Sequence, residues 1–311
     1  MVMVWQVRRA RVSGWVGTYR NWTRLMRKSG YPLSMPTLAW NREKWNQNYR
    51  WADAGEEWSA VWGGSESEWR SCILPRVAGF LPTGSLLELG PGFGRWTEYL
   101  LPSCTSYLGV DLADSCTAAC EERFAGHEGA RFATNDGRSL PMVPDSSVDL
   151  VFSFDSLVHA EDDAIGAYLE EFHRVLSSDG VAFIHHSNIG VYHATVALRD
   201  LLARVGDPFP LPRAILGRVG LANWHHYRGR SMTATRFLEL SRTAGLACIG
   251  QEIVNWASPL LIDCISIVTR PGSKWERANI RVTNRHFRTA ARSSAAAARV
   301  FQFQLPGPRG T

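Results

Sequence analysis

The sequence contains no run of about 18 apolar residues, the minimum for a helix that crosses a bilayer, and we therefore expect no membrane span. Its first residues also lack the apolar stretch of a secretory signal, so we expect a cytoplasmic protein. The six cysteines match no metal-ligand spacing, and Cys116 and Cys120, one helical turn apart, are poorly placed for a disulfide. Free, buried thiols are expected instead.

Acidic residues are absent from the first 30 residues and almost absent from the last 42. Residues 1–30 carry a charge of +7 and residues 270–311 carry +8, so the segment between them carries −10 within a net charge of +5. Basic ends on an acidic core favour an anionic partner. The candidates are an anionic membrane leaflet, a lipid-pyrophosphate carrier and the acidic core itself, and simply solvated ends are the alternative.

The length of 311 residues leaves room for one core domain with extensions. We expect this domain at residues 71–270. An aromatic-rich, basic helical extension precedes it at residues 1–70, and a basic tail follows at residues 271–311.

A glycine-rich turn is the most informative motif of the core domain. The apolar residues Leu86 to Leu89 predict a strand that runs into Gly90, Gly92 and Gly94, and helix-forming residues follow. Such a turn brings a ligand close to bare backbone at the positive end of a helix. The spacing differs from the GxGxxG dinucleotide fingerprint, and Glu88 would repel phosphate but could hold an ammonium group.

Three further strands follow in order, each ending in a polar side chain. Residues 106–110 predict a strand that ends at Asp111, placed to accept hydrogen bonds from both hydroxyls of a ribose. Residues 131–134 run into the turn Asn135-Asp136-Gly137, and residues 147–153 open onto Phe154 and Asp155.

The rest of the core alternates helices and strands. Apolar residues at helical spacing predict a helix over 163–175, a fifth strand covers 181–185, and a second helix covers 233–244 after an insertion at 187–230. Two final strands, 247–253 and 261–268, are joined by a short turn near residues 257–259 and must be antiparallel. The pattern predicts a doubly wound, mostly parallel α/β sheet whose ligands bind beyond the carboxyl ends of the strands.

With these elements in this order, the chain resembles class I S-adenosylmethionine (SAM)-dependent methyltransferases, whose Rossmann-like sheet ends in such a hairpin. The resemblance implies SAM as cofactor and S-adenosylhomocysteine as product. It also implies that Asp136 meets the adenine amino group, while Glu88, Gly90 and Gly92 lie at the methionine end. The expected cofactor-binding residues are Trp62, Glu88, Gly90, Gly92, Gly94, Arg95, Asp111, Leu112, Asn135, Asp136, Gly137 and Phe154.

Tryptophan is concentrated near the N-terminus, with nine of thirteen before residue 70. We interpret residues 51–70 as a lid over the cofactor, with Trp62 nearest to it. The alternative is that these rings pack the N-terminal helices on the sheet.

The residues after the fourth strand are the candidate catalytic groups. Asp155 and His159 are four residues apart, which on a helix would place both on one face, so Asp155 would orient His159 as general base for a hydroxyl. Alternatively, Asp155, His159 and Glu161 hold a divalent metal, which we do not favour because the Glu-x-x-Glu-His pattern of metal-binding quinone methyltransferases is incomplete. A structural role for His159 is the third alternative. The reserve candidates His185 and His186 end the fifth strand, and only one of them can readily face the substrate.

The insertion supplies polar aromatic and basic residues that suit a hydroxyl-rich acceptor, namely Tyr192, His225, Tyr227 and Arg228. Segments 152–159, 185–188 and 224–228 resemble bacterial methyltransferases that act on sugars of glycans and glycolipids. The resemblance implies a sugar O-methyltransferase whose acceptor is free or lipid-linked. The rival readings are a methyltransferase of a secondary metabolite, with an O- or N-acceptor, and a non-catalytic SAM-fold scaffold. Nucleic acid is not expected, because the basic residues avoid the catalytic edge.

Overall fold

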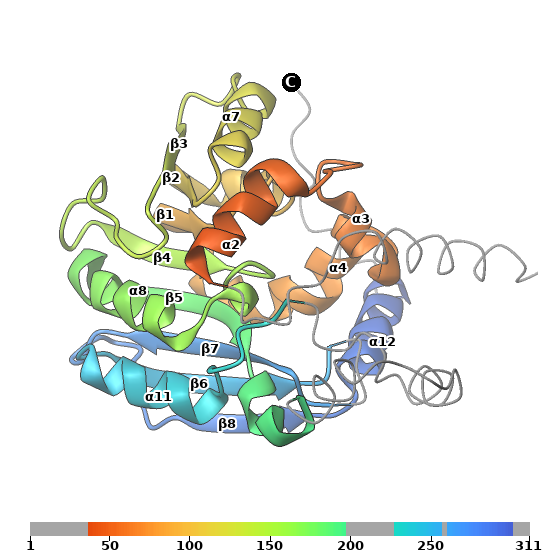
Figure 1. Cartoon of the computed structure of the whole chain (residues 1–311), viewed down its shortest axis with the longest axis vertical. Helices are drawn as coiled ribbons and strands as arrows, with labels where there is room; N and C mark the ends of the chain where they lie inside the picture. Colours follow the sequence, from red (N-terminus) through yellow and green to blue (C-terminus); the bar gives the residue numbers. More distant parts are fainter. Residues whose placement is uncertain (1–36, 197–226, 257–259, 301–311) are drawn as a thin grey trace, which may run out of the picture. The chain divides into compact units, whose positions relative to one another are not determined.

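The computed structural model describes residues 37–196, 227–256 and 260–300, and its centre is an eight-stranded sheet (Figure 1). The strand order is β3-β2-β1-β4-β5-β7-β6-β8. Every strand is parallel to its neighbours except β7, which pairs antiparallel with both β5 and β6. The strands are β1 (Thr83–Leu89), β2 (Cys104–Asp111), β3 (Ala130–Thr134), β4 (Val148–Ser153), β5 (Leu176–Ser187), β6 (Ala247–Val254), β7 (Asp263–Thr269) and β8 (Ile280–Asn284).

Helices and short helical turns precede the sheet and connect its strands. The α-helices of the described chain are α2 (Leu38–Glu43), α3 (Glu56–Ser59), α4 (Ser65–Glu68), α5 (Leu74–Val77), α6 (Thr97–Leu100), α7 (Asp114–Arg123), α8 (Asp162–Val175), α11 (Ala234–Thr243) and α12 (Phe287–Val300). The short helical turns are η1 (Lys44–Asn48), η2 (Ala60–Trp62), η3 (Trp69–Ile73), η4 (Ala78–Phe80), η5 (Leu101–Ser103), η6 (Leu157–His159) and η7 (Ile189–Tyr192).

Apolar side chains cover both faces of the sheet. Helices α8 and α11 lie side by side on one face (Figure 1), where Phe172 and Phe237 pack against sheet residues such as Ala182 and Ile184. The other face packs against the N-terminal helical segments, α6 and α12, and on it the ring of Phe152 stacks on that of Phe183 at 5.6 Å. Because each face is closed by helices, ligand access is left to the ends of the strands.

The expected fold class and most expected elements are confirmed. Helix α8 begins one residue before the predicted 163–175 segment, and all five apolar residues that predicted it (Ile165, Tyr168, Leu169, Phe172, Val175) are buried. Helix α11 starts after Thr233, whose hydroxyl accepts the N–H of Arg236 as an N-cap, and Gly245 follows it with φ of +77°. The antiparallel hairpin β6–β7 is present, while its turn at 257–259 lies outside the described residues.

The expectation that residues 271–311 form a basic tail needs correction, because part of this segment belongs to the sheet. Strand β8 pairs with the edge strand β6, and Arg281 donates to the side-chain oxygen of Gln251 on β6. Helix α12 then buries Phe287 against Trp62 and Trp256. Without β8, strand β6 would be an unpaired edge of the sheet, and without Phe287 the apolar site beside Trp62 and Trp256 would be unfilled. These two contacts explain why the segment folds onto the core.

Some expectations lie outside the described residues, including the basic stretch 1–30 and residues 197–226 of the insertion, with His225 among them. All six cysteines are free, and all but the half-buried Cys104 are buried, as expected. No helix in the described ranges is both long and apolar enough to cross a bilayer.

Candidate functional site

The glycine turn after β1 has the backbone that its sequence predicts. Gly90, Gly92 and Gly94 have φ of +70°, +58° and +85°, a region that other residues rarely adopt. A Cβ at Gly92 would lie 2.9 Å from the ring of Trp51, and one at Gly90 would lie 1.8 Å from Oγ of Ser156. Neighbouring side chains therefore reach the bare backbone of this turn, so glycine is required there.

Asp111 ends β2 beside the glycine turn and is buried. Its two carboxylate oxygens accept the backbone N–H groups of Gly92, at 3.0 Å, and Ala113, at 2.9 Å. Burial raises the pKa of Asp111 to about 6, and these N–H groups oppose that rise. A carboxylate has about four lone-pair sites, so Asp111 retains the capacity to accept further hydrogen bonds.

The turn after β3 supports itself with its own side chains. The buried Asn135 donates to the hydroxyl of Tyr168 and accepts the N–H of Gly137. Asp136 is exposed and accepts the N–H groups of Arg138 and Ser139, and these bonds hold its pKa below the usual range although partial burial opposes them. This geometry is compatible with the expected cofactor role but does not test it.

Apolar side chains meet at this turn. A Cβ at Gly137 would lie 2.4 Å from Leu38 and 3.0 Å from the expected cofactor residue Leu112. Leu38 lies on α2 and was not among the residues that the sequence indicated. The two leucines make an apolar wall beside the Asp136 turn.

Helix α2 and the turn η1 cover this edge of the sheet, and α2 passes in front of β1 and β4 in Figure 1. Asn41 donates to the carbonyl of His159, Arg42 donates to that of Asn135, and the side chain of Asn46 accepts the N–H of Ser115. Residues 38–48 are therefore tied to the segments that follow β2, β3 and β4.

The expectation that Trp62 lies nearest the cofactor is wrong. Trp62 is buried in the apolar core, with ring centroids 5.0 Å from Trp256 and 5.8 Å from Phe287. Trp51 instead lies over Gly92 and stacks on Phe93 at 4.7 Å. The sequence indicated that an aromatic ring covers the cofactor site, but it did not indicate which tryptophan supplies that ring.

Glu88 has a structural role beside the glycine turn, and its expected role as an ammonium ligand stays a prediction. It lies on the same sheet face as Leu86, and its carboxylate accepts hydrogen bonds from Thr97 Oγ1, at 2.8 Å, and from the Tyr107 hydroxyl. Burial raises its pKa to about 7, and these two hydroxyl groups oppose the rise. Glu88 therefore ties α6 and β2 to β1 beneath the glycine turn.

Arg95, expected at the cofactor, is buried and already paired. Its guanidinium donates to Asp155 at 2.8 Å and to the hydroxyl of Ser59 at 3.1 Å, and Glu68 is 3.9 Å away. Burial opposes ionisation of Asp155, but the charge and hydrogen bond of Arg95, together with His185 and Arg228, outweigh burial and lower the pKa of Asp155. Arg95 thus joins the N-terminal helices to the end of β4.

The expected Asp155–His159 pair does not form. Asp155 has a left-handed backbone with φ of +60°, and His159 ends the 3₁₀ turn η6. The four-residue spacing therefore does not bring the two side chains onto one helical face. Asp155 binds Arg95, whereas His159 Nδ1 lies 3.0 Å from the carbonyl oxygen of Tyr227.

His159 is nevertheless set up as a neutral imidazole. Because a carbonyl oxygen can only accept, Nδ1 carries the proton and Nε2 keeps its lone pair. Burial lowers the pKa of His159 to about 4, although the Tyr227 carbonyl and the charge of Asp155 oppose this shift. A neutral imidazole with one lone pair can accept a proton.

The Trp45 ring stands next to His159 and belongs to a cluster of four aromatic rings that we call the aromatic wall: Trp45, Tyr49, Trp51 and Trp58. The Trp45 ring lies 5.0 Å from that of His159 and 6.2 Å from that of Trp51. Tyr49 stacks on Trp58 at 5.3 Å. The wall thus runs from the glycine turn to His159.

His186 is not a candidate base. It is fully buried and stacks on Phe237 at 4.3 Å, and both of its ring nitrogens have hydrogen-bond partners, in Ser187 and Ser266. Burial lowers its pKa to about 3. We therefore assign His186 to the core.

His185 belongs to a buried network at the same edge. Its Nδ1 accepts the N–H of Asp155 at 3.2 Å, so Nε2 carries the proton and points to Asp263 at 3.5 Å. Asp263 also accepts two bonds from Arg228, at 2.5 and 2.6 Å. Arg228, expected at the acceptor, therefore forms an ion pair with Asp263, a residue that no sequence pattern indicated.

The remaining expected residues lie around this edge. The buried Phe154 packs on His185 at 4.6 Å, and the Tyr192 hydroxyl accepts the N–H of Leu261. The ring of Tyr227 lies 5.0 Å from that of Trp40. Their expected roles in binding stay predictions.

The alternative metal site does not assemble from its three expected ligands. Glu161 accepts the backbone N–H groups of Arg230 and Ser231, Asp155 binds Arg95, and His159 binds Tyr227. In the described ranges, no group of three or more His, Cys, Asp or Glu side chains is placed to hold a metal ion.

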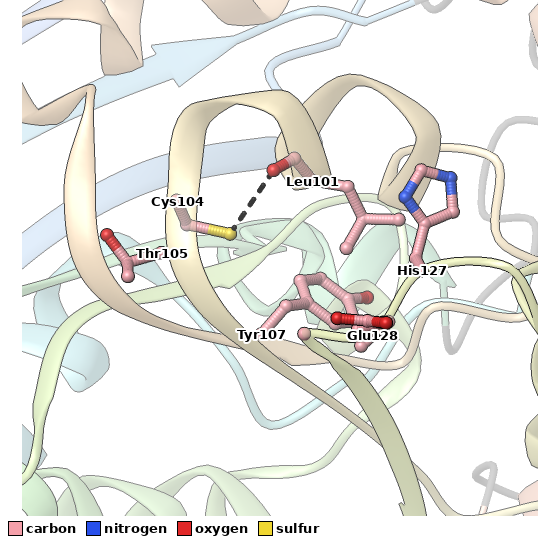
Figure 2. A pocket seen from close by; sticks show the side chains of 8 residues that line it. Leu101, Cys104, Thr105, Tyr107, His127 and Glu128 are labelled. Atoms are coloured by element: carbon pink, nitrogen blue, oxygen red, sulfur yellow. Dashed lines mark hydrogen bonds between the residues drawn. The ribbon is translucent and has the colours of Figure 1, made fainter. Parts of the chain in front are cut away.

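A separate surface hollow of about 170 Å³ lies at the start of β2 and β3 and is shown in Figure 2. Its lining includes Cys104, Tyr107, His127 and Glu128. Since it lies at the amino ends of the strands, it is not part of the edge that carries Asp111 and His159.

Comparison with known proteins supports the expected resemblance. Residues 86–180 match the family described as a methyltransferase domain. The chain is 30% identical over 117 residues to a phosphoethanolamine N-methyltransferase of Triticum aestivum, a match that covers 36% of this chain and 23% of that protein. The chain thus spans about a quarter of the length of this relative.

Two solved structures are similar to this chain at low sequence identity. A SAM-dependent methyltransferase of Mesorhizobium loti is 20% identical, with a TM-score of 0.45, over 66% of this chain and 98% of that chain. A putative methyltransferase of Haloferax volcanii, in complex with the Trm112 activator, is 16% identical, with a TM-score of 0.48, over 71% of this chain and 96% of that chain.

Proposed function

We propose that this chain, whose residues 86–180 are a methyltransferase domain of the SAM-dependent class, transfers a methyl group to a hydroxyl of a sugar in a glycan, glycolipid or glycoside. The observation that carries the proposal is the neutral His159, whose Nε2 keeps its lone pair beside the aromatic wall. Aromatic faces suit the C–H edges of sugar rings, and a hydroxyl that is methylated must lose its proton. A cytoplasmic location is part of this proposal.

The residues at the carboxyl edge fit SAM, which when bound supplies an electrophilic methyl group. Gly90 and Gly92 offer bare backbone, Asp111 can accept from the ribose hydroxyls, and the Asp136 turn with Leu112 suits adenine. The six-membered ring of Trp51 lies beside Gly92, and the buried indole N–H of Trp51 has no hydrogen-bond partner among the described residues. It therefore suits the carboxylate at the methionine end.

His159 is the proposed general base. Nε2 takes the proton of the acceptor hydroxyl, and the carbonyl of Tyr227 then holds the Nδ1–H of the imidazolium. A sugar hydroxyl is too weak an acid to ionise unaided at neutral pH, so a positioned base contributes about 10²–10⁴-fold. Arg95 holds Asp155 away from His159, so Asp155 contributes through its negative charge rather than by a hydrogen bond.

Transfer to an amine is the second candidate. The wheat relative is named a phosphoethanolamine N-methyltransferase, and an aromatic wall also suits a cation. His159, with a pKa of about 4, is a weak base for a hydroxyl, whereas a neutral amine attacks with its own lone pair and needs no base in the transfer step.

Transfer of labelled methyl from SAM to a panel of acceptors separates the candidates. The panel contains free glycosides, lipid-linked glycosides, phosphoethanolamine and other small amines. Label in the glycosides alone supports the proposal, whereas label in the amines alone replaces it with N-methylation. SAM binding without transfer to any acceptor favours the scaffold reading.

A further inference from the structure

A basic surface is formed by β8, α12 and the residues that flank them, and we call it the β8–α12 surface. Four of its arginines have no ion pair with any other described residue: Arg277, Arg285, Arg288 and Arg292. Arg281 lies on the opposite face of β8, where it bonds to Gln251 and Thr235, whereas Arg288 donates to the carbonyl of Val61. From residue 277 onward the sequence contains no acidic residue. The positive charge of this surface is therefore not neutralised by carboxylates of the described chain.

Exposed aliphatic side chains lie among these arginines. Five large apolar side chains are exposed in the described chain, and three belong to this surface: Ile280 at 56%, Val282 at 51% and Val61 at 41%. Ile280 and Val282 point to one face of β8 because side chains alternate along a strand. Exposed aliphatic groups concentrated on one surface indicate an interaction site.

Contacts between neighbouring residues connect the two ends of the surface. Val282 is the register partner of Glu252, which bonds to Arg76. The guanidinium of Arg76 lies 4.6 Å from the ring of Phe287, the first residue of α12. Arg288, the next residue of α12, donates a hydrogen bond to the carbonyl of Val61. The aliphatic and basic side chains thus share one continuous region.

We infer that the β8–α12 surface docks on an anionic lipid bilayer. Guanidinium groups bind lipid phosphates, and aliphatic side chains enter the boundary between headgroups and acyl chains. Single-stranded nucleic acid would instead favour exposed aromatic rings for base stacking, and the three exposed large apolar residues here are aliphatic. The inference does not depend on which acceptor is methylated.

The surface also lies close to the candidate site. Phe287 stacks on Trp256 at 5.6 Å, and Trp256 lies 5.0 Å from the ring of His185. Docking would therefore bring a membrane near the carboxyl edge of the sheet, where a lipid-linked acceptor would be used.

The charge of the surface is tested by sedimentation of the full chain with vesicles. Vesicles of phosphatidylcholine alone are compared with vesicles that also contain phosphatidylglycerol. The double variant Arg285→Gln/Arg292→Gln should weaken binding to the anionic vesicles by about thirtyfold, since each basic side chain contributes about 1 kcal/mol at such a surface. The matched control Arg131→Gln/Arg242→Gln removes two exposed arginines elsewhere and should bind like the wild type.

A second pair of variants tests the aliphatic groups. Ile280→Thr/Val282→Thr keeps the β-branched shape of strand β8 and should weaken binding by about tenfold through lost apolar contact. The control Val191→Thr changes a residue that is 57% exposed outside the surface and should have no effect.

Three results would overturn the inference. These are equal binding to neutral and anionic vesicles, unchanged binding of both surface variants, and preference of the full chain for an RNA oligonucleotide over anionic vesicles. Circular dichroism of each variant confirms that the fold is kept, so that a loss of binding reports on the surface.

Discussion

At the scale of single residues, the site is defined by which polar atoms are already bonded within the chain. Arg95, His186 and Arg228 all lie near the edge, but their polar groups are bonded to core partners. Asp111, Trp51 and His159 keep a lone pair or a donor for a ligand. This distinction depends on three-dimensional partners, which residue type and spacing do not specify.

Asp111→Asn should weaken SAM binding by about 1.5–3 kcal/mol, because the ribose hydroxyls lose a charged acceptor. Because the pKa of Asp111 is about 6, the affinity for SAM should also depend on pH. The ionised carboxylate accepts hydrogen bonds better than the protonated form, and it is lost as pH falls through about 6. Calorimetry between pH 5 and 8 should show affinity rising with pH in the wild type and a flatter profile in the variant.

The control for this variant is Asp114→Asn, which changes an exposed carboxylate at the start of α7. It should leave the affinity for SAM unchanged. Equal affinities of the Asp111 variant and the wild type would remove Asp111 from the cofactor site.

Trp51→Phe tests the donor that the sequence did not indicate. Phenylalanine keeps a ring over Gly92 and on Phe93 but removes the indole N–H, so SAM affinity should fall by about 1.5 kcal/mol, as expected for a hydrogen bond to a charged group. Trp58→Phe is the matched control within the aromatic wall. If both variants bind SAM like the wild type, the Trp51 N–H has no cofactor role.

At the scale of elements, strong periodic patterns could be predicted and contacts between distant segments could not. Helix α8 follows from five apolar residues at helical spacing, and the glycine turn follows from three glycines that need positive φ. The short strand β8 gave no such signal, because its apolar and polar alternation covers only five residues. The Asp155–His159 spacing misled because the backbone at Asp155 is left-handed.

The C-terminal elements should prove to be part of the fold. Phe287 is fully buried and anchors α12, so Phe287→Ala should lower the free energy of unfolding by about 3–5 kcal/mol. Urea unfolding measures this loss, with the exposed Thr289→Ala as control. A Phe287 variant as stable as the wild type would mean that residues 280–300 are a detached tail.

At the scale of the whole molecule, one buried acid makes stability depend on pH. Burial raises the pKa of Glu68 to about 8, and the nearby charge of Arg95 opposes the rise. The folded chain thus holds a proton that the unfolded chain releases above about pH 4.5, so this contribution to stability is lost as pH rises towards 8.

Glu68→Gln should therefore be more stable relative to the wild type at pH 8 than at pH 5. Urea unfolding at the two values measures the difference, and Glu66→Gln, which changes an exposed residue of the same helix, should show no such change. The raised pKa of Glu68 would be contradicted if the free energy of unfolding of Glu68→Gln differed from that of the wild type by the same amount at pH 5 and pH 8.

The measurement that tests the central claim most directly is the turnover of His159→Gln with SAM and the acceptor identified from the panel. Turnover should fall by about 10²–10⁴-fold while the affinity for SAM stays within about twofold, because the base acts on the acceptor and not on the cofactor. His127→Gln, an exposed histidine at the opposite edge of the sheet, should keep full activity. Full activity of the His159 variant would contradict the account and move the search for the base to His185.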